Sequence, residues 1–150
     1  MAELLHPLLI PSSWLVRGQY FPAQGSPQKV LGTTEIRADE EFPETLRVLG
    51  EIRDAEDPSS RPVATEFVLD LVAPGSVRFH MNSIPLGTVL VGNGSWNSEQ
   101  LEFHYSSPDR RILGVESYAA VGPELLLTAG VMFADAVPVT WWLARMEKVR

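Results

Sequence analysis

The chain has 150 residues, of which 45% are hydrophobic and 21% are charged, and its formal net charge is −7. This composition predicts one folded domain over residues 1–150, with enough apolar residues for a core that needs no disulfide or metal. The acidic balance argues against nucleic-acid binding and against docking on anionic membranes. The absence of cysteine excludes disulfides, thiol catalysis and thiolate metal sites, and it fits a reducing compartment.

The N-terminal segment predicts a lid rather than a targeting signal. Leucines between residues 4 and 9 recur at helical spacing, so a turn or two of helix is expected to lie across an open end of the fold. The segment has no basic region, carries Glu3 and contains two prolines, unlike a signal peptide. No stretch approaches the roughly 18 apolar residues of a membrane span. The sequence therefore predicts a cytoplasmic protein.

After the lid, short stretches of the chain alternate apolar and polar residues at every second position. Leu101, Phe103 and Tyr105, for example, alternate with Glu102 and His104. Side chains of a strand point to opposite faces with a period of two, so each stretch is expected to be a strand with one buried face. The predicted strands are residues 13–21, 30–38, 44–53, 63–73, 76–82, 87–92, 100–106, 110–120, 124–134 and 139–148.

The connections between these strands are mostly short. Pro74-Gly75 has the residues of a type II turn, Asn93-Gly94 is interpreted as a hairpin turn, and 54–62 as a long polar loop. Short connections favour a meander, and closing it removes two exposed edges and an uncovered apolar face. The prediction is an all-β fold, an up-and-down antiparallel meander barrel of eight to ten strands, with a β-sandwich as the alternative.

Two segments carry a family resemblance. Residues 5–14 (LHPLLIPSSW), followed by 18–22 (GQYFP), resemble the opening of calycin-type barrels, and in form the small lipocalin-like and nitrobindin-like bacterial families. Residues 141–145 (WWLAR) are similar to the closing strand of such barrels. The resemblance implies a calycin barrel in which Arg145 returns toward Trp14 and closes the narrow end through a cation–π contact.

The chain departs from that family pattern at two positions. Ser12 stands where a glycine usually precedes the tryptophan by two residues. The nitrobindin-like families hold haem through a histidine on the closing strand, whereas this chain aligns Trp142 with that ligand and has no histidine after His104. Haem ligated in this way is therefore not expected, and no cofactor is predicted.

Aromatic residues on the apolar parities of the strands are expected to face inward. They either fill the core or line a pocket for a flat or elongated apolar ligand. The candidate ligand-binding residues are Phe67, Phe79, Phe103, Tyr105, Tyr118, Phe133 and Trp141.

Glu116 is the one candidate catalytic residue. It shares a parity with Tyr118, but the other parity of the same strand also carries apolar residues, so both orientations stay open. Facing inward, it would need a partner such as Tyr105, Tyr118 or an arginine. His80 and His104 are flanked by large apolar residues and are expected to point outward, where they cannot act in a pocket.

No metal site is predicted. The acidic segment 35–57 is interpreted as a solvated hairpin edge, because its carboxylates match the spacing of no known calcium loop. His6, beside Pro7, is expected to make a contact of the lid.

Three functions remain open on this evidence. The leading one is a module that binds a small hydrophobic or aromatic molecule inside the barrel, entering at the end opposite Trp14. The second is a cofactor-free isomerase, lyase or decarboxylase that uses Glu116 and tyrosines. The third is a filled barrel whose exterior forms a homodimer.

Overall fold

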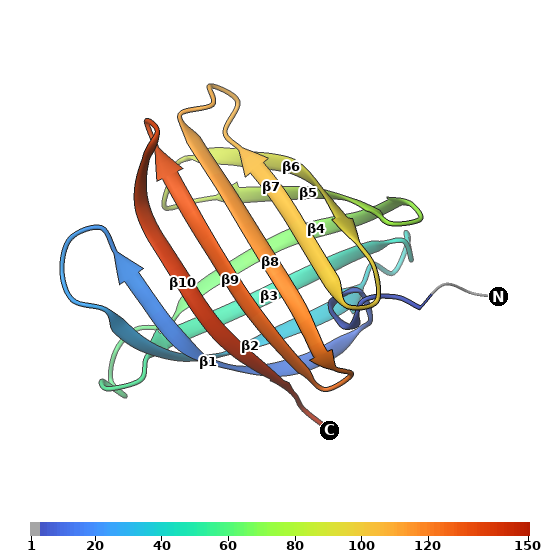
Figure 1. Ribbon diagram of the computed structural model, residues 1–150, viewed down its shortest axis with the longest axis horizontal. Coiled ribbons are helices and arrows are strands. Elements are labelled where there is room, and N and C mark those ends of the chain that lie inside the picture. The colour runs from blue at the N-terminus through green and yellow to red at the C-terminus, as the bar shows by residue number, and fades with distance from the viewer. Residues whose placement is uncertain (1–3) are drawn as a thin grey trace.

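The computed structural model describes residues 4–150, and this part of the chain forms a closed barrel in which each strand pairs with its neighbours in sequence and β1 pairs with β10 (Figure 1). All pairs are antiparallel, which confirms the predicted up-and-down meander. Residues 1–3, with the Glu3 used above, lie outside the described residues. The elements are η1 (Pro7–Leu9), β1 (Ser12–Pro22), β2 (Gln28–Ala38), β3 (Thr45–Asp54), β4 (Val63–Ala73), β5 (Ser76–Ser83), β6 (Thr88–Trp96), β7 (Gln100–Ser106), β8 (Ile112–Gly122), β9 (Leu125–Ala134) and β10 (Val137–Lys148).

The strands bury one face each, as the alternation predicts. On β7, Leu101, Phe103 and Tyr105 are buried, whereas Glu102 and His104 are exposed. His80 on β5 is exposed as well, so the outward orientation expected for both histidines is confirmed. Within residues 4–150, no helix is long and apolar enough to cross a membrane.

The turn predicted at Asn93-Gly94 is wrong, because both residues lie inside β6. Gly92 and Gly94 face inward, and a Cβ atom on either would overlap the β7 backbone, so these glycines serve a close approach of two strands. The chain turns later, where the Asn97 Oδ1 atom accepts hydrogen bonds from the backbone N–H groups of Glu99 and Gln100. Such side-chain-to-backbone bonds are typical of an Asx turn.

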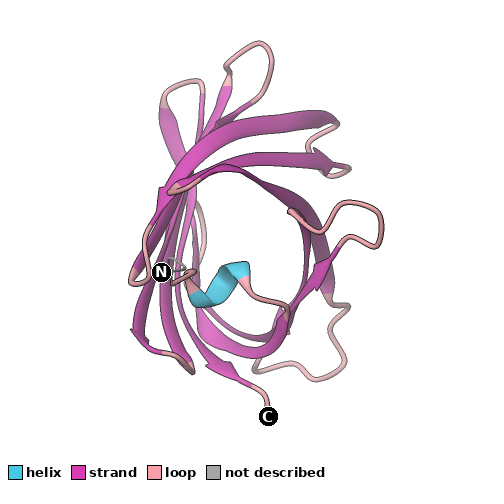
Figure 2. Cartoon of the chain, turned by 90° about the vertical axis from the view of Figure 1, so that its right-hand side faces the viewer, coloured by secondary structure: helices cyan, strands magenta, loops and turns pink. Residues whose placement is uncertain are grey.

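The N-terminal lid lies across one end of the barrel, as expected (Figure 2). Leu8 and Leu9 of η1 are buried. The fully buried His6 ring fixes the lid twice: its Nδ1 accepts from the Leu8 N–H at 3.1 Å, and its Nε2 lies 3.1 Å from the Tyr118 carbonyl oxygen. This pattern requires a neutral ring with its proton on Nε2. Burial lowers the pKa of His6, and the bond to Tyr118 opposes that change.

The half of the barrel beneath the lid is filled by side chains. Its core includes Trp14, Leu69, Phe79, Leu101 and Phe103, each at most 2% exposed. Ring centroids of Phe79 and Phe103 are 5.0 Å apart and those of Phe67 and Phe79 are 5.2 Å apart. Such contacts add to the free energy of burying the rings.

Substitution of Gly75 tests the turn between β4 and β5. Gly75 has φ +76°, which confirms the positive φ expected in a type II turn. Gly75→Val should destabilise the protein by about 1–3 kcal/mol, measured by urea unfolding, because a β-branched residue is strained at this φ. Gly122→Ala is the control, since no atom lies within 4 Å of the added Cβ and φ is not positive. Equal effects of the two substitutions would contradict this turn assignment.

Protonation of His6 should weaken the lid. A histidine in the unfolded chain has a pKa of about 6.5, and the pKa of His6 in the folded protein is lower. The contribution of neutral His6 to the free energy of unfolding is therefore present above this pH and is lost as the pH falls. His6→Gln should cost about 1–3 kcal/mol at neutral pH, through lost bonds to buried backbone groups. Urea unfolding at neutral and at mildly acidic pH measures this, and the difference between the two proteins should shrink in acid. A difference that stays constant with pH would show that the His6 ring is not held neutral.

Candidate functional site

An interior cavity of about 280 Å³ occupies the barrel half that lies away from the lid. Tyr20 on β1, Ile52 on β3 and Met81 on β5 line it, and each lies toward the strand end opposite η1. The barrel interior is therefore divided into a filled half and a hollow half. Apolar and aromatic residues make up most of the cavity wall, which is usual for a small-molecule site.

Four of the candidate aromatic residues line this cavity, namely Phe67, Phe79, Tyr105 and Tyr118. Phe103 does not: it is fully buried in the filled half, between Phe79 and Tyr118. The prediction that Phe103 lines the pocket is therefore wrong.

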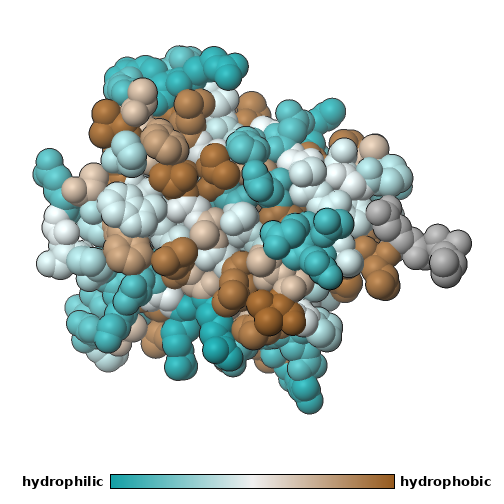
Figure 3. Space-filling view, in the orientation of Figure 1, coloured by the Kyte–Doolittle hydropathy of each residue, from teal (hydrophilic) through white to brown (hydrophobic). Residues whose placement is uncertain are grey.

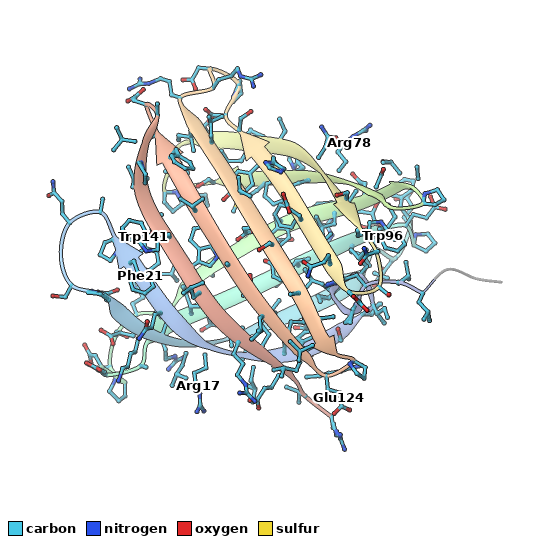
Figure 4. The ribbon with its side chains drawn as sticks, in the orientation of Figure 1. Arg17, Phe21, Arg78, Trp96, Glu124 and Trp141 are labelled. Carbon is cyan, nitrogen blue, oxygen red and sulfur yellow. The ribbon has the colours of Figure 1, made fainter. Side chains whose placement is uncertain are left out.

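The inward orientation predicted for Phe133 and Trp141 is wrong. Trp141 is 40% exposed, and its ring stacks on that of Phe21 outside the barrel, with centroids 5.8 Å apart (Figure 4). Phe133 shares the outward parity of β9 and lines a groove on the outer surface. A register shift between Pro138 and Thr140 puts the neighbouring Trp142 on the inner face instead.

Trp14 and Arg145 do not close the barrel together. Trp14 faces inward at 1% exposure and donates a hydrogen bond from Nε1 to the Ser12 hydroxyl. Arg145 faces outward, pairs with Glu147 at 2.9 Å and lies beside Arg17 in the register of β1 and β10. Trp14 pairs with Lys148 rather than with Arg145, and the two side chains point to opposite faces of the barrel wall. The predicted cation–π contact is therefore not formed.

Glu116 points into the cavity from β8. The residue keeps some surface open to the cavity, but protein atoms surround its carboxyl group, and this burial raises its pKa to about 7. The Tyr118 hydroxyl, as a donor to the carboxylate, opposes the rise. Burial, together with the charge of Glu116, also raises the pKa of Tyr105. Thr128, which faces Tyr118 across the β8–β9 pair, has a buried hydroxyl that approaches the Tyr118 hydroxyl but makes no hydrogen bond of good geometry.

Two inward glycines make room for rings beside Glu116. A Cβ atom on Gly114 would overlap the Tyr105 ring, and one on Gly130 would overlap the Trp142 indole. Gly130 pairs with Glu116 on one side and with Trp142 on the other, so the indole lies over Gly130 in the same cross-strand row as Glu116. The sequence contains this signal, because glycine inside a strand often marks a close approach.

Among residues 4–150, Glu116 is the only charged side chain on the cavity wall, to which these residues contribute no lysine, arginine, histidine or aspartate. Haem held through a histidine does not fit these residues, since none of the described residues on the wall is a histidine and the Trp142 indole N–H only donates. Among residues 4–150, no group of three or more histidine, cysteine or acidic side chains is arranged to hold a metal ion. The acids of 35–57 instead form surface pairs, such as Glu35 with Arg37.

The barrel wall is split between β4 and β5. These strands pair from Val68↔His80 to Ala73↔Ser76, so residues 63–67 of β4 and 81–83 of β5 do not pair with each other. An outer groove of about 740 Å³ lies there, and Thr65 and Met81 line both this groove and the cavity. Because Thr65 and Met81 line both spaces, the groove and the cavity adjoin at the split.

Comparison with solved structures shows a calycin-like barrel. Rv2717c from M. tuberculosis matches with a TM-score of 0.72 and 19% identity, over 96% of this chain and 94% of that one. The S-type phycobiliprotein lyase CPES from Guillardia theta matches with a TM-score of 0.68 and 16% identity, over 93% and 88%. A DUF3598 protein of unknown function from Nostoc punctiforme has a TM-score of 0.60 and 14% identity, over 99% and 50%. No protein-family model and no curated protein matches the chain.

Removing the charge of Glu116 should stabilise the protein. The folded pKa of about 7 exceeds the ordinary value of 4.5, so the folded chain keeps a proton that the unfolded chain loses, and stability falls as the pH rises between these values. Glu116→Gln should therefore exceed the wild type by on the order of 3 kcal/mol at mildly alkaline pH, as measured by urea unfolding.

The gain from Glu116→Gln should shrink toward the lower of the two pKa values. Glu102→Gln on the outer face of β7 removes the same charge from an exposed site, so it serves as the control. Equal responses of the two variants would mean that the Glu116 carboxylate is solvated.

Proposed function

We propose that the barrel binds one small apolar or aromatic molecule in its interior cavity. The observation that carries the proposal is the hollow half of the barrel, whose aromatic and aliphatic wall includes a few polar groups beside Glu116. Apolar walls with a small number of placed polar groups are typical of ligand sites. The filled half and the lid give this cavity a rigid floor.

The size of the cavity limits the ligand. An engineered cavity of about 150 Å³ binds benzene, so a volume of about 280 Å³ suits a body of two fused rings. Burying about 200 Å² of apolar surface contributes roughly 5 kcal/mol before association costs. We therefore expect micromolar rather than nanomolar affinity for a ligand of this class.

We propose that the ligand enters through the split between β4 and β5. Thr65 and Met81 lie between the outer groove and the cavity, and residues 63–67 of β4 form no ladder hydrogen bonds across the split to residues 81–83 of β5. Backbone without cross-strand pairing opens at a lower free-energy cost than paired strands do.

A cofactor-free enzyme is the second candidate. A carboxylate with a pKa of about 7 inside a cavity suits a general base, because proton transfer is most efficient near the working pH. The similar barrel of a phycobiliprotein lyase is compatible with this reading, although an identity of 16% supports the fold alone. Turnover that Glu116→Gln abolishes would favour this candidate over simple binding.

Closer kinship with the nitrobindin-like families, a cytoplasmic location and a homodimer also remain proposals. For the homodimer, the exposed Leu127, Trp141 and Leu143 supply apolar surface on the outer faces of β9 and β10. The face in Figure 3 mixes such apolar residues with polar ones.

A neutral naphthalene dye, prodan, tests the pocket by fluorescence titration. The wild type should bind it saturably, with a blue-shifted emission. Met132→Trp, which adds a large ring to the cavity wall, should weaken binding by at least about tenfold, or about 1.4 kcal/mol. Phe133→Trp is the matched control, because the next residue of β9 faces outward.

Thermal melting of both variants checks that they fold. The absence of saturable binding by the folded wild type would refute the pocket, and equal binding by the two tryptophan variants would place the dye elsewhere.

A further inference from the structure

The cavity wall has an uncompensated charge, which restricts the ligands that it can accept. The Glu116 carboxyl group is buried without a cationic partner. The groups that face it from the neighbouring strands are the phenols of Tyr105 on β7 and Tyr118 on β8, the hydroxyl of Thr128 on β9 and the indole of Trp142 on β10. None of these groups carries a positive charge. A buried carboxylate is costly unless it is paired, so the site lacks a cation that a ligand can supply.

We propose that the cavity selects ligands in which an apolar, aromatic-sized body carries a protonated amine, with the ammonium group held against Glu116. This inference rests on the proposed binding function and specifies its ligand class. The geometry supports it through the rings beside the carboxylate, the Thr128 hydroxyl that makes no hydrogen bond of good geometry, and a wall to which residues 4–150 contribute no basic side chain.

The rings around Glu116 favour an ammonium group. The Trp142 indole lies over Gly130, which is the cross-strand partner of Glu116, and the Tyr105 ring lies over Gly114, two residues before Glu116 on the same strand. Aromatic faces attract cations, and cages of such rings recognise ammonium ligands. A carboxylate placed among the rings adds a charge-assisted hydrogen bond from the N–H donors of the ligand.

Thr128 supplies a second acceptor. Its residue is 8% exposed and lies on the cavity wall opposite Tyr118. Its Oγ1 atom approaches the Tyr118 hydroxyl but makes no hydrogen bond of good geometry. A buried hydroxyl without a partner is unfavourable, so a ligand that donates to it would be stabilised. An ammonium group offers three N–H donors, enough for both Glu116 and Thr128.

The same wall disfavours anionic ligands. A carboxylate or phosphate group in the cavity would meet the charge of Glu116 and find no lysine, arginine or histidine side chain on the wall. Like charges that approach one another in a poorly solvated site repel strongly. Fatty-acid-like ligands are therefore expected to bind worse than neutral ligands of the same shape.

Three probes that share one naphthalene body test this inference: 1-naphthylmethylamine, 1-naphthalenemethanol and 1-naphthoic acid. Their dissociation constants are measured by calorimetry at mildly alkaline pH, where the carboxylate is ionised and the amine is protonated. The amine should bind at least about tenfold more tightly than the alcohol, and the acid at least about tenfold more weakly, each factor equal to about 1.4 kcal/mol.

Glu116→Gln should remove the preference for the amine while leaving the affinity for the alcohol unchanged within about threefold, or about 0.7 kcal/mol. Glu102→Gln is the matched control, because it removes one negative charge from the protein as Glu116→Gln does, but from the outer surface, and it should keep the full preference. The amine should also bind with release of a proton as the pH is lowered toward the pKa of Glu116, which calorimetry in buffers of different ionisation heat detects.

The outcomes separate the two proposals. If none of the three probes binds to the folded wild type, the binding function itself is wrong. If the probes bind but the acid equals or exceeds the amine, or if Glu116→Gln keeps the amine preference, the cavity binds apolar ligands and the selection of amines is wrong.

Discussion

The pairing of β1 with β10 is the constraint on which the rest of the structure depends. It runs from Trp14↔Lys148 to Pro22↔Thr140 and turns a meander with two open edges into a barrel with none at this seam. A barrel of this many strands encloses more space than side chains from its own strands fill. At one end of the barrel, the leucines of η1 pack into this space and complete a filled half, whereas the other half remains hollow. Lid, core and cavity thus follow from closure.

Stability and the candidate site oppose each other at Glu116. The barrel would gain stability from an uncharged residue there, because burial of the carboxylate favours its protonated form. Gly114 and Gly130 also give up side-chain packing so that two rings can lie beside the carboxylate. Departures from the stability optimum in one small region are expected at functional sites rather than in a structural core. That concentration distinguishes this row of residues from the packed half under the lid.

The sequence predicted the strands and their closure because a period of two is read directly from residue types. It could not orient β9 and β10, since Leu127, Val131 and Phe133 make the outer face of β9 at least as apolar as its inner face. The apolar pattern therefore did not determine which faces of β9 and β10 are buried. The Asn93-Gly94 turn failed for a related reason: glycine serves both turns and close strand contacts, and only the position of β7 distinguishes them. The orientation of Glu116 likewise depended on which parity the neighbouring strands cover.

The two ends of the barrel differ in how completely their backbone groups are hydrogen-bonded to neighbouring strands. Beneath the lid, η1 is joined to β8 through the His6–Tyr118 bond, and the β1–β10 seam is continuous. At the other end, β4 and β5 separate beyond the Val68↔His80 pair, which leaves strand edges without a ladder partner. Unpaired edges are costly and invite unwanted pairing, so proteins usually avoid them. Their occurrence beside the hollow half, and not beside the packed half, is the observation on which the proposed access to the cavity rests.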